Sequence, residues 1–510
     1  MTCAILAVAK DEDKYLNEWI DYHLMLGFDH IYICDNNSSD TPIILDNDRG
    51  HKITIFPYHN IDFSKNFSSN QENCYNYHLE KLWDKYDYCA IIDIDEFFEF
   101  RDCSNVKEFI QKHIIDLNHT VAEIPWEVYS DNDLIYSQES YPVLKTYIKI
   151  SDKLPFSWGN NINSWGKSIF KLNKGITTTP HWPNSASMTK FDTNHVLSDI
   201  AVVKHYRTKS LEEFLNHKVK NRAFSVSPQS DGGNIIKTYF TINDVTVEKL
   251  LYILDYYHNN SCIFTSEDKL FIKDCFDKLG FITVVIRTHN RLSFLKDCIK
   301  SVENQTKLPD ILVLDDGSYP EVFEWCSKKS INYVRSHKNV GSSEILMRGR
   351  HLIQTPYYII LDDDDFWTRL TVIEEFYDLI LNNPGYDIYG NNYFHTGSLV
   401  KTKLLLDCPM VSLSGLGEDW YFCWIKKYGK LCPVNIPFSF YHYRRSHNEN
   451  QLSNIHLDGS ISRIVSDYYN QQNYPQIIKN IEKIYYTTSP KERKILDQIK
   501  QYINNKSLDS

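Results

Sequence analysis

The sequence predicts an α/β protein with two tandem domains, each built on a mostly parallel sheet. Three observations indicate this class. The order of strands and helices from residue 2 is repeated from residue 281, each copy contains an apolar strand followed by aspartates, and a segment rich in Ser, Pro and Gly separates the copies. A chain of 510 residues is also long for one hydrophobic core. The expected organisation is a first domain at 1–225, a helical bridge at 226–280, a second domain at 281–446 and a helical tail at 447–510.

The first copy alternates strands and helices. Its expected elements are a strand at 2–10, a helix at 11–27, a strand at 30–40, a helix at 68–86 and a strand at 88–100. Gly27 is expected to close the first helix, and a strand, a helix and a parallel strand make one right-handed crossover unit. The second strand ends in Asp35 and a polar turn, and the third contains Asp93 and Asp95 in YCAIIDIDEFFEF.

The second copy has the same order. Its expected elements are a strand at 281–290, a helix at 291–305, a strand at 310–318, a helix at 342–355 and a strand at 357–365. The polar turns correspond as well, with DNNS after the second strand of the first copy and DDGS after that of the second. We interpret the repeat as a duplicated domain type.

Helical patterns outside the two copies account for the bridge and the tail. NDVTVEKLLYILDYYHN and SEDKLFIKDCFDKLG are expected to form a helical bridge between the copies. YPQIIKNIEKIY and KERKILDQIKQYINN are expected to form packing or docking helices in the tail. Neither region carries the aspartate pattern of the copies.

Composition narrows the class of protein. Hydrophobic residues make up 42% and charged residues 24%, which is typical of a globular protein, and a net charge of −11 argues against a nucleic-acid partner. The apolar run in MTCAILAVAK is too short for a signal peptide or a membrane span, so a cytoplasmic location is expected. The 12 cysteines include no CxxC pair, so we expect reduced, mostly buried thiols rather than a zinc knuckle or a disulfide framework.

The aspartates at the strand ends predict a donor site in each copy. Ligands of open α/β sheets bind beyond the carboxyl ends of the parallel strands. Asp35 and Asp315 are placed to accept hydrogen bonds from a ribose or a base. Asp-x-Asp side chains that point the same way on a strand can hold Mn²⁺ or Mg²⁺ through oxygen. Such a cation stabilises a leaving diphosphate, and no glycine-rich phosphate loop is present, so a nucleotide-sugar donor is predicted.

The second copy resembles glycosyltransferase family 2, whose members have the Rossmann-like GT-A fold. The resemblance spans about residues 281–446 and lies in VVIRTHNRLSFLKDCIKSVENQT, LVLDDGS, NVGSSEILMRGRHL, ILDDDDFW and GEDWYF, in that order. It implies cation binding by Asp362 and Asp364, with Asp363 and Asp365 as alternatives in register. The donor-binding residues that it implies are Thr288, Asn290, Asp315, Asp316, Arg350 and Asp362.

The same resemblance supplies a mechanism for the second copy. In GEDWYF it implies Asp419 as the general base of an inverting transfer, with Glu418 beside it, because the acceptor hydroxyl must lose its proton as it attacks. FYHYRRSHNENQLS resembles the segment that closes over the donor phosphates, where Arg445 would contact the donor and His447 the cation.

The first copy resembles glycosyltransferase family 92 over about residues 2–222. The resemblance lies in AKDEDKYLNEWIDYHLMLGFDHIYICDNNSSD, IIDIDEF, WGKSIFK and KHYRTKSLEEFLNHK. It implies that Asp35 and Asp93 bind the donor, that Asp93 and Asp95 bind the cation, and that His205 or His181 completes the cation site. UDP is the implied carrier. The base and the stereochemistry of this copy stay open.

Structural interpretations compete with these roles. Asp35 and Asp315 could cap the turns that follow them, and Glu418–Asp419 could be a charge pair at a helix N-terminus. His181 could be a loop histidine and His205 a satisfied strand residue. Four tryptophans near the expected clefts could stack on sugars: Trp158, Trp165, Trp182 and Trp420.

The leading functional hypothesis is a bifunctional transferase that adds two sugars to a glycan, glycoprotein or glycolipid acceptor. One rival is a single active domain beside a degenerate binding or scaffold domain. Another is a glycan-binding or assembly protein that only keeps the fold. A nucleotidyltransferase or metal-dependent phosphohydrolase is a further rival, but AVAKDEDKY and VIRTHNRLS lack the Gly-rich, Lys-containing loop usual in nucleotidyltransferases.

Overall fold

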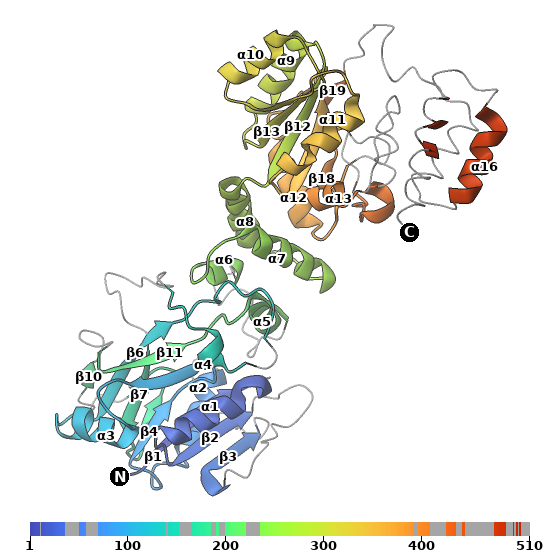
Figure 1. The fold of residues 1–510 in the computed structure, drawn as a ribbon. Coiled ribbons are helices and arrows are strands. Elements are labelled where there is room, and N and C mark those ends of the chain that lie inside the picture. The colour runs from blue at the N-terminus through green and yellow to red at the C-terminus, as the bar shows by residue number, and fades with distance from the viewer. Residues whose placement is uncertain are drawn as a thin grey trace. The chain divides into compact units, whose positions relative to one another are not determined.

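The computed structural model divides the chain into two compact units, Met1–Val245 and Thr246–Ser510 (Figure 1). The residues that the structure describes are 1–10, 12–35, 50–57, 70–138, 141–151, 166–184, 190–192, 199–220, 235–390, 396–408, 425–434, 441–443, 474–485, 493, 496, 497, 499 and 500.

A mixed sheet forms the centre of the first unit. Its strands, in spatial order, are β3 (Ile53–Pro57), β2 (His30–Asp35), β1 (Cys3–Ala9), β4 (Tyr88–Ile91), β7 (Gly166–Lys171), β6 (Val121–Val128), β11 (Ala201–His205) and β5 (Glu96–Phe100). β10 (Lys190–Asp192) pairs with β6, and β8 (Thr177–Thr178) forms a small hairpin with β9 (Pro183–Asn184). The first four strands are parallel, and β7 is antiparallel to β4.

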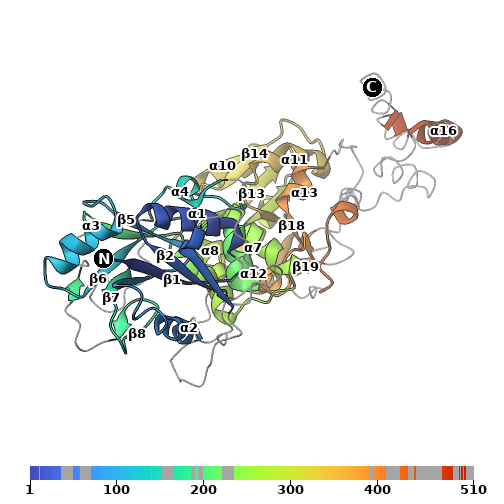
Figure 2. The same cartoon turned by 90° about the horizontal axis from the view of Figure 1, so that it is seen from below.

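Helices cover both faces of this sheet because β1 is apolar at every position. Its odd-numbered residues pack with the apolar side chains of α1, and its even-numbered residues pack with those of α2, on opposite faces (Figure 2). Gly27 has a positive φ and ends the turn after α1, as predicted. The helical segments are α1 (Asp13–Met25), η1 (Gly50–Lys52), α2 (Asn70–Leu79), α3 (Val106–Ile110) with η3 (Gln111–Ile115), α4 (Val143–Thr146), α5 (Leu211–Leu215) with η5 (Asn216–Lys220) and α6 (Ile235–Phe240).

The second unit contains a smaller sheet of the same kind. Its strands, in spatial order, are β14 (Asn332–Arg335), β13 (Asp310–Asp315), β12 (Ile282–Thr288), β15 (Tyr357–Asp362), β18 (Leu399–Lys401) and β17 (Ile388–Tyr389). A short ladder pairs β16 (Asp365–Trp367) with β19 (Tyr441–Tyr443). The helical segments are α7 (Val247–Asn259), α8 (Ser266–Leu279), α9 (Leu292–Glu303), α10 (Pro320–Lys328), α11 (Ser342–Gly349), η6 (Arg350–Leu352), α12 (Val372–Asn382), α13 (Thr402–Leu406) and α16 (Tyr474–Ile484).

The two sheets repeat one plan, which confirms the α/β class and the duplicated GT-A architecture. The order β3-β2-β1-β4 in the first unit corresponds to β14-β13-β12-β15 in the second, and an antiparallel strand follows in each, β7 or β18. In both sheets the strand order reverses between the first strand and the aspartate-bearing strand. This switch point is where open α/β sheets leave room for a ligand.

The expectation that each Asp-x-Asp motif lies along a strand is wrong. The strand predicted at 88–100 is two strands, β4 and β5, and the strand predicted at 357–365 ends at Asp362. The residues between β4 and β5 form a turn in which Asp93 N donates to the Glu96 carboxylate at 2.9 Å. The motifs therefore lie in turns at the carboxyl ends of β4 and β15, so alternation along a strand does not orient their side chains.

The two helices expected between the copies are present as α7 and α8, and both belong to the second unit. α6 was not predicted and packs on the first unit, where the Tyr239 ring lies near that of Phe214 and the Tyr239 hydroxyl donates to Asp131. α8 packs on the second unit through Phe276, whose ring centroid lies 3.8 Å from that of Phe281. α16 coincides with the first predicted tail helix. None of the helices in the described part of the chain is long and apolar enough to cross a membrane.

A buried histidine, His23, is expected to make the first unit acid-sensitive. His23 in α1 is 0% exposed, its Nδ1 lies 2.8 Å from the carbonyl oxygen of Trp19, and burial lowers its pKa to about 3. The unfolded chain binds a proton near pH 6.5, so the free energy of unfolding should fall as pH drops from 6.5 toward 3. We expect this group to remove about 2 kcal/mol between pH 7 and pH 5.

Urea unfolding at the two pH values measures this effect. His23→Gln should lose less stability between pH 7 and pH 5 than the unaltered chain, whatever its stability at pH 7. His51→Gln, at an exposed position of the same unit, is the control and should keep the full pH dependence. Equal pH dependence in His23→Gln and the unaltered chain would refute the assignment.

Candidate active sites

A buried lysine fixes the acidic turn of the first unit. Lys167 in β7 has a side chain that is 0% exposed, and its Nζ lies 2.6 Å from Asp93 Oδ2 and 3.3 Å from Glu96 Oε2. The other oxygen of Asp93 accepts hydrogen bonds from Gln71 and Tyr75 of α2. Both oxygens of Asp93 therefore have protein partners, and the lysine neutralises part of the charge in the turn.

Asp95 lies on the other side of this turn, beside a histidine. Asp95 Oδ2 is 3.7 Å from His205 Nε2, and His205 Nδ1 is 4.0 Å from Glu96 Oε1. Burial lowers the pKa of His205 and raises the pKa of Glu96 to about 8. Although burial acts to raise it, the pKa of Asp95 is held well below its usual value by His205, Lys209 and Lys218. A neutral imidazole next to an ionised carboxylate is a suitable ligand pair for a divalent cation.

The rings of the two candidate histidines, His181 and His205, both contact the ring of Trp126. The Trp126 ring centroid is 4.5 Å from that of His205 and 5.4 Å from that of His181. His181 Nδ1 lies 3.1 Å from the carbonyl oxygen of Gly166, and burial followed by the charge of Lys167 lowers its pKa to about 4. Of the two, His205 is the one whose ring nitrogens face the carboxylates of the turn.

Further residues of the first unit surround the strand ends. Asp35 ends β2, opposite Ala9 of β1 and Pro57 of β3. Glu12 follows β1, and its Oε2 lies 3.4 Å from Lys209 Nζ. Burial raises the pKa of Glu12. Trp182 lies next to His181, with ring centroids 5.3 Å apart.

Two arginines contact three of the four consecutive aspartates of the second unit. Arg287 Nη2 lies 2.5 Å from Asp362 Oδ1 at the end of β15. Arg291 bridges two neighbours, with Nη2 at 2.7 Å from Asp363 Oδ1 and Nη1 at 2.7 Å from Asp364 Oδ2. Four carboxylates and two guanidinium groups leave a formal charge of −2 in this turn, which is the charge that one divalent cation would balance.

Asp365 is the carboxylate that the arginines do not reach. It is 0% exposed, and neither oxygen has a hydrogen-bond partner within the described residues. Burial, followed by the charges of Asp362 and Asp364, raises its pKa to about 8, and burial raises the pKa of Asp363 to about 7. Burial is the main cause of both raised pKa values, and for Asp365 the charges of the neighbouring carboxylates add to it.

The polar turn after β13 joins the loops around the second site. Asp315 Oδ1 accepts a hydrogen bond from Ser318 N at 2.8 Å, so this aspartate caps its own turn, as one sequence interpretation proposed. Asp316 accepts hydrogen bonds from the backbone of Val340 and Gly341 at 2.6 and 2.8 Å. Gly317 has a positive φ, and a Cβ there would lie 2.5 Å from the carbonyl carbon of Lys338. Asp315 and Asp316 therefore hold the backbone of the loops at this edge of the sheet.

Thr288 and Asn290 connect the end of β12 to both acidic segments. Thr288 Oγ1 donates to Asp363 Oδ2 at 2.7 Å, and Asn290 N donates to Ser318 Oγ at 2.8 Å. Arg350 instead lies at the end of α11, where its guanidinium donates to the carbonyl oxygen of Cys408. The structure thus brings together Thr288, Asn290, Asp315, Asp316, Asp362 and Asp364, and it places Arg350 elsewhere.

Several predicted site residues lie outside the described part of the chain. They are Trp158, Trp165, Glu418, Asp419, Trp420, Arg445 and His447. β19 is the described strand that precedes Arg445 and His447 in the sequence, and its last residue, Tyr443, pairs with Asp365. β19 therefore ends beside the aspartates.

The two turns share a feature that was not predicted from the sequence, although Asp365 was one of the register alternatives. An acidic residue directly follows each Asp-x-Asp motif and begins the next strand, Glu96 in β5 and Asp365 in β16. Both are fully buried, and burial raises the pKa of each to about 8. The sequences DIDE (93–96) and DDDD (362–365) both contain this additional acidic residue, and an alignment of the two copies that extends past the Asp-x-Asp motif would have shown it.

Replacing Lys167 by methionine should destabilise the first unit. Loss of the ammonium group would leave the carboxylates of Asp93 and Glu96 without their buried counter-ion, at a cost of about 3 kcal/mol in the free energy of unfolding. Urea unfolding measures the change. Lys171→Met, at the exposed end of the same strand, is the control and should cost much less. Equal losses for the two variants would show that Lys167 contributes no buried ion pair.

Comparisons with known families agree with this geometry. Residues 283–444 match the model of glycosyl transferase family 2, and residues 3–275 match that of glycosyltransferase family 92. The protein is a glycosyltransferase. It belongs to glycosyltransferase family 92, whose model covers more than half of the chain, with a family 2 domain following it, and the expected tandem is confirmed. A search of curated proteins gave no match.

Solved structures show a limited likeness to this chain. TarS residues 1–349 from S. aureus, in complex with UDP-GlcNAc, is 13% identical with a TM-score of 0.32 and covers 43% of this chain and 70% of its own. The mannosyltransferase PcManGT from Pyrobaculum calidifontis, with GDP-Man and Mn²⁺, is 12% identical with a TM-score of 0.29 and covers 51% and 81%. Glucosyl-3-phosphoglycerate synthase from Mycobacterium tuberculosis is 14% identical with a TM-score of 0.29 and covers 39% and 83%.

Proposed function

We propose that this chain is a two-domain, metal-dependent transferase that moves one sugar per domain from nucleoside-diphosphate donors to hydroxyl groups of a growing glycan. One observation carries the proposal. Each unit has an Asp-x-Asp turn with a buried acid after it, at the same switch point of the same sheet plan. A duplicated cation site at the place where α/β sheets bind ligands fits two donors better than one.

In the first unit, Asp95 and His205 would hold the cation, with Asp93 and Glu96 beside them. His205 is preferred to His181 because its Nε2 faces Asp95 at 3.7 Å. Asp35, at the end of β2, would contact the nucleotide of the donor, for which UDP is the proposed carrier. When bound, Mn²⁺ or Mg²⁺ would stabilise the charge of the leaving diphosphate.

In the second unit, Asp362 and Asp364 would hold the cation, and Asp365 would add its unpartnered carboxylate. Thr288 keeps Asp363 in place, and Arg291 holds Asp363 and Asp364 together. Asn290, Asp315 and Asp316 would form the nucleotide side of the site, with Arg445 and His447 closing it over the phosphates.

The acceptor step of the second unit needs a base. We assign it to Asp419, with Glu418 beside it, so that the acceptor hydroxyl loses its proton to Asp419 as its oxygen attacks the anomeric carbon opposite the diphosphate. The anomeric configuration would therefore invert. The acceptor is a glycan, glycoprotein or glycolipid.

A donor screen tests the proposal. The purified chain would be incubated with UDP-, GDP- and dTDP-sugars, with Mn²⁺ or with EDTA, and both hydrolysis and the melting temperature would be measured. At least one donor should be hydrolysed and should raise the melting temperature only when the cation is present. No response to any donor would contradict the proposal and indicate a fold used for binding or assembly.

A second candidate is one active domain beside a binding domain. The hydrogen bonds of Asp93 favour this candidate, because both of its oxygens already accept from Lys167, Gln71 or Tyr75. A cation would therefore compete with the buried ammonium group of Lys167 for Asp93. In that case only variants of the second unit would lose hydrolysis in the donor screen. Loss of a different donor's hydrolysis in each unit's variants would exclude it.

A further inference from the structure

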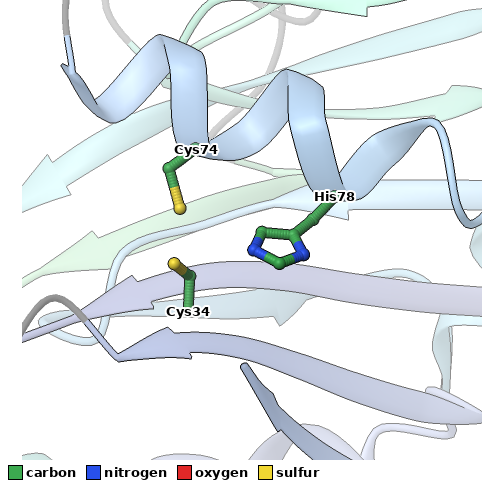
Figure 3. Close-up of side chains that lie close together, drawn as sticks. All are labelled: Cys34, Cys74 and His78. Atoms are coloured by element: carbon green, nitrogen blue, oxygen red, sulfur yellow. The ribbon is translucent and has the colours of Figure 1, made fainter. Parts of the chain in front are cut away.

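Two cysteines and a histidine meet inside the first unit, away from the acidic turn. Cys34 lies on β2, and Cys74 and His78 lie one turn apart on α2 (Figure 3). One ligand atom from each residue lies within 4.8 Å of the other two. Figure 3 shows the two sulfur atoms facing each other with the imidazole ring beside them. Such convergence of thiols and an imidazole is typical of a site for a soft transition metal.

The histidine of this cluster is buried without a hydrogen-bond partner. His78 is 2% exposed, and neither ring nitrogen has a partner within the described part of the chain. Its ring stacks on Phe56 with the centroids 4.3 Å apart, which fixes its orientation. A buried imidazole that makes no hydrogen bond to the described residues is available to a metal ion, whereas an ordinary core histidine would be hydrogen-bonded.

We propose that Cys34, Cys74 and His78 bind one Zn²⁺ ion. Two thiolates and a neutral imidazole give a formally neutral complex with Zn²⁺, which suits a fully buried position, whereas Cu⁺ would leave a buried negative charge. Binding would release the two thiol protons. None of these three residues belongs to the donor sites described above.

The ion would stabilise α2 against β2, next to the first donor site. α2 also carries Gln71 and Tyr75, whose side chains donate to Asp93, and Cys34 directly precedes Asp35. The four α2 positions 71, 74, 75 and 78 lie on one face of the helix, so an ion held by two of them fixes the orientation of the other two. The proposed role is therefore structural.

Metal analysis of the full chain tests the proposal. After equilibration with ZnCl₂ and removal of loosely bound ion, the unaltered chain should retain one Zn²⁺ that is absent from Cys74→Ala and from His78→Ala. Cys89→Ala is the matched control, because Cys89 is also a fully buried cysteine of the same hydrophobic cluster but lies outside the ligand set, and it should retain the ion. Retention of the ion by Cys74→Ala and His78→Ala, or no ion in the unaltered chain, would overturn the proposal.

The spectrum of the Co²⁺-substituted, unaltered chain gives a second readout that needs no variant. Thiolate ligation produces a sulfur-to-cobalt charge-transfer band, which carboxylate ligands of the acidic turns cannot produce. The band should appear at one equivalent of Co²⁺ and disappear when one equivalent of Zn²⁺ is added. Absence of the band, or a mass and alkylation pattern that shows a Cys34–Cys74 disulfide in the purified chain, would overturn the proposal.

Discussion

Asp95→Asn is expected to lower sugar transfer by the first domain about 1,000-fold, because loss of a charged cation ligand removes several kcal/mol of transition-state stabilisation. Asparagine keeps the shape of the side chain but cannot balance the cation. Asp95 faces the neutral His205 at 3.7 Å and keeps a strongly lowered pKa despite its burial, so it is ionised under all assay conditions near neutrality. Transfer from the second domain's donor should be unchanged.

The measurement is the rate of product formation with each donor separately, at saturating Mn²⁺. Asp84→Asn, at an exposed position between α2 and β4, is the matched control and should keep full activity with both donors. An Asp95→Asn variant that stays folded and transfers from both donors at the normal rate would refute the assignment of Asp95.

Asp364→Asn is expected to have the opposite pattern. The substitution reduces the charge of the four-aspartate turn from four carboxylates to three, while Arg291 keeps its contact with Asp363. Transfer from the second domain's donor should fall about 1,000-fold, and transfer from the first domain's donor should not change.

The matched control for the second domain is Asp310→Asn. Asp310 is an exposed residue that begins β13. It therefore lies at the amino end of the strands, whereas the aspartate turn lies at their carboxyl end. Its replacement should leave both activities intact. Full activity of Asp364→Asn with its own donor would show that this aspartate does not bind the cation, and Asp362 and Asp365 would then be tested in the same way.

The parallel strands at the centre of both sheets could be predicted from the sequence alone. Strands such as Cys3–Ala9 and Ile282–Thr288 are buried at every residue, and such uninterrupted apolar runs between amphipathic helices predict a sheet covered on both faces. The repeated order of elements then predicted the duplication. β6, β7 and β11 were not predicted, because their pairing depends on segments far apart in the chain.

The sequence predicted the strand ends at which the aspartates lie, but it did not predict the turns that contain them. A single apolar run with aspartates reads as one strand, whereas the Glu96 carboxylate bonds to Asp93 N and closes a turn there. Lys167 was missed because it lies 74 residues from its partner Asp93 and no local pattern links them. The same is true of Cys34, which is separated from Cys74 and His78 by the chain between β2 and α2.

The central claim is that the chain binds two donors at two separate sites. Equilibrium binding of the donors found in the screen, with Mn²⁺ present, should give two sites in the unaltered chain. Asp95→Asn should lose one site and Asp364→Asn the other, each with a different donor, and the double variant should bind neither. If both single variants lose the same donor and the unaltered chain binds only one, the two turns serve one composite site and the account is wrong.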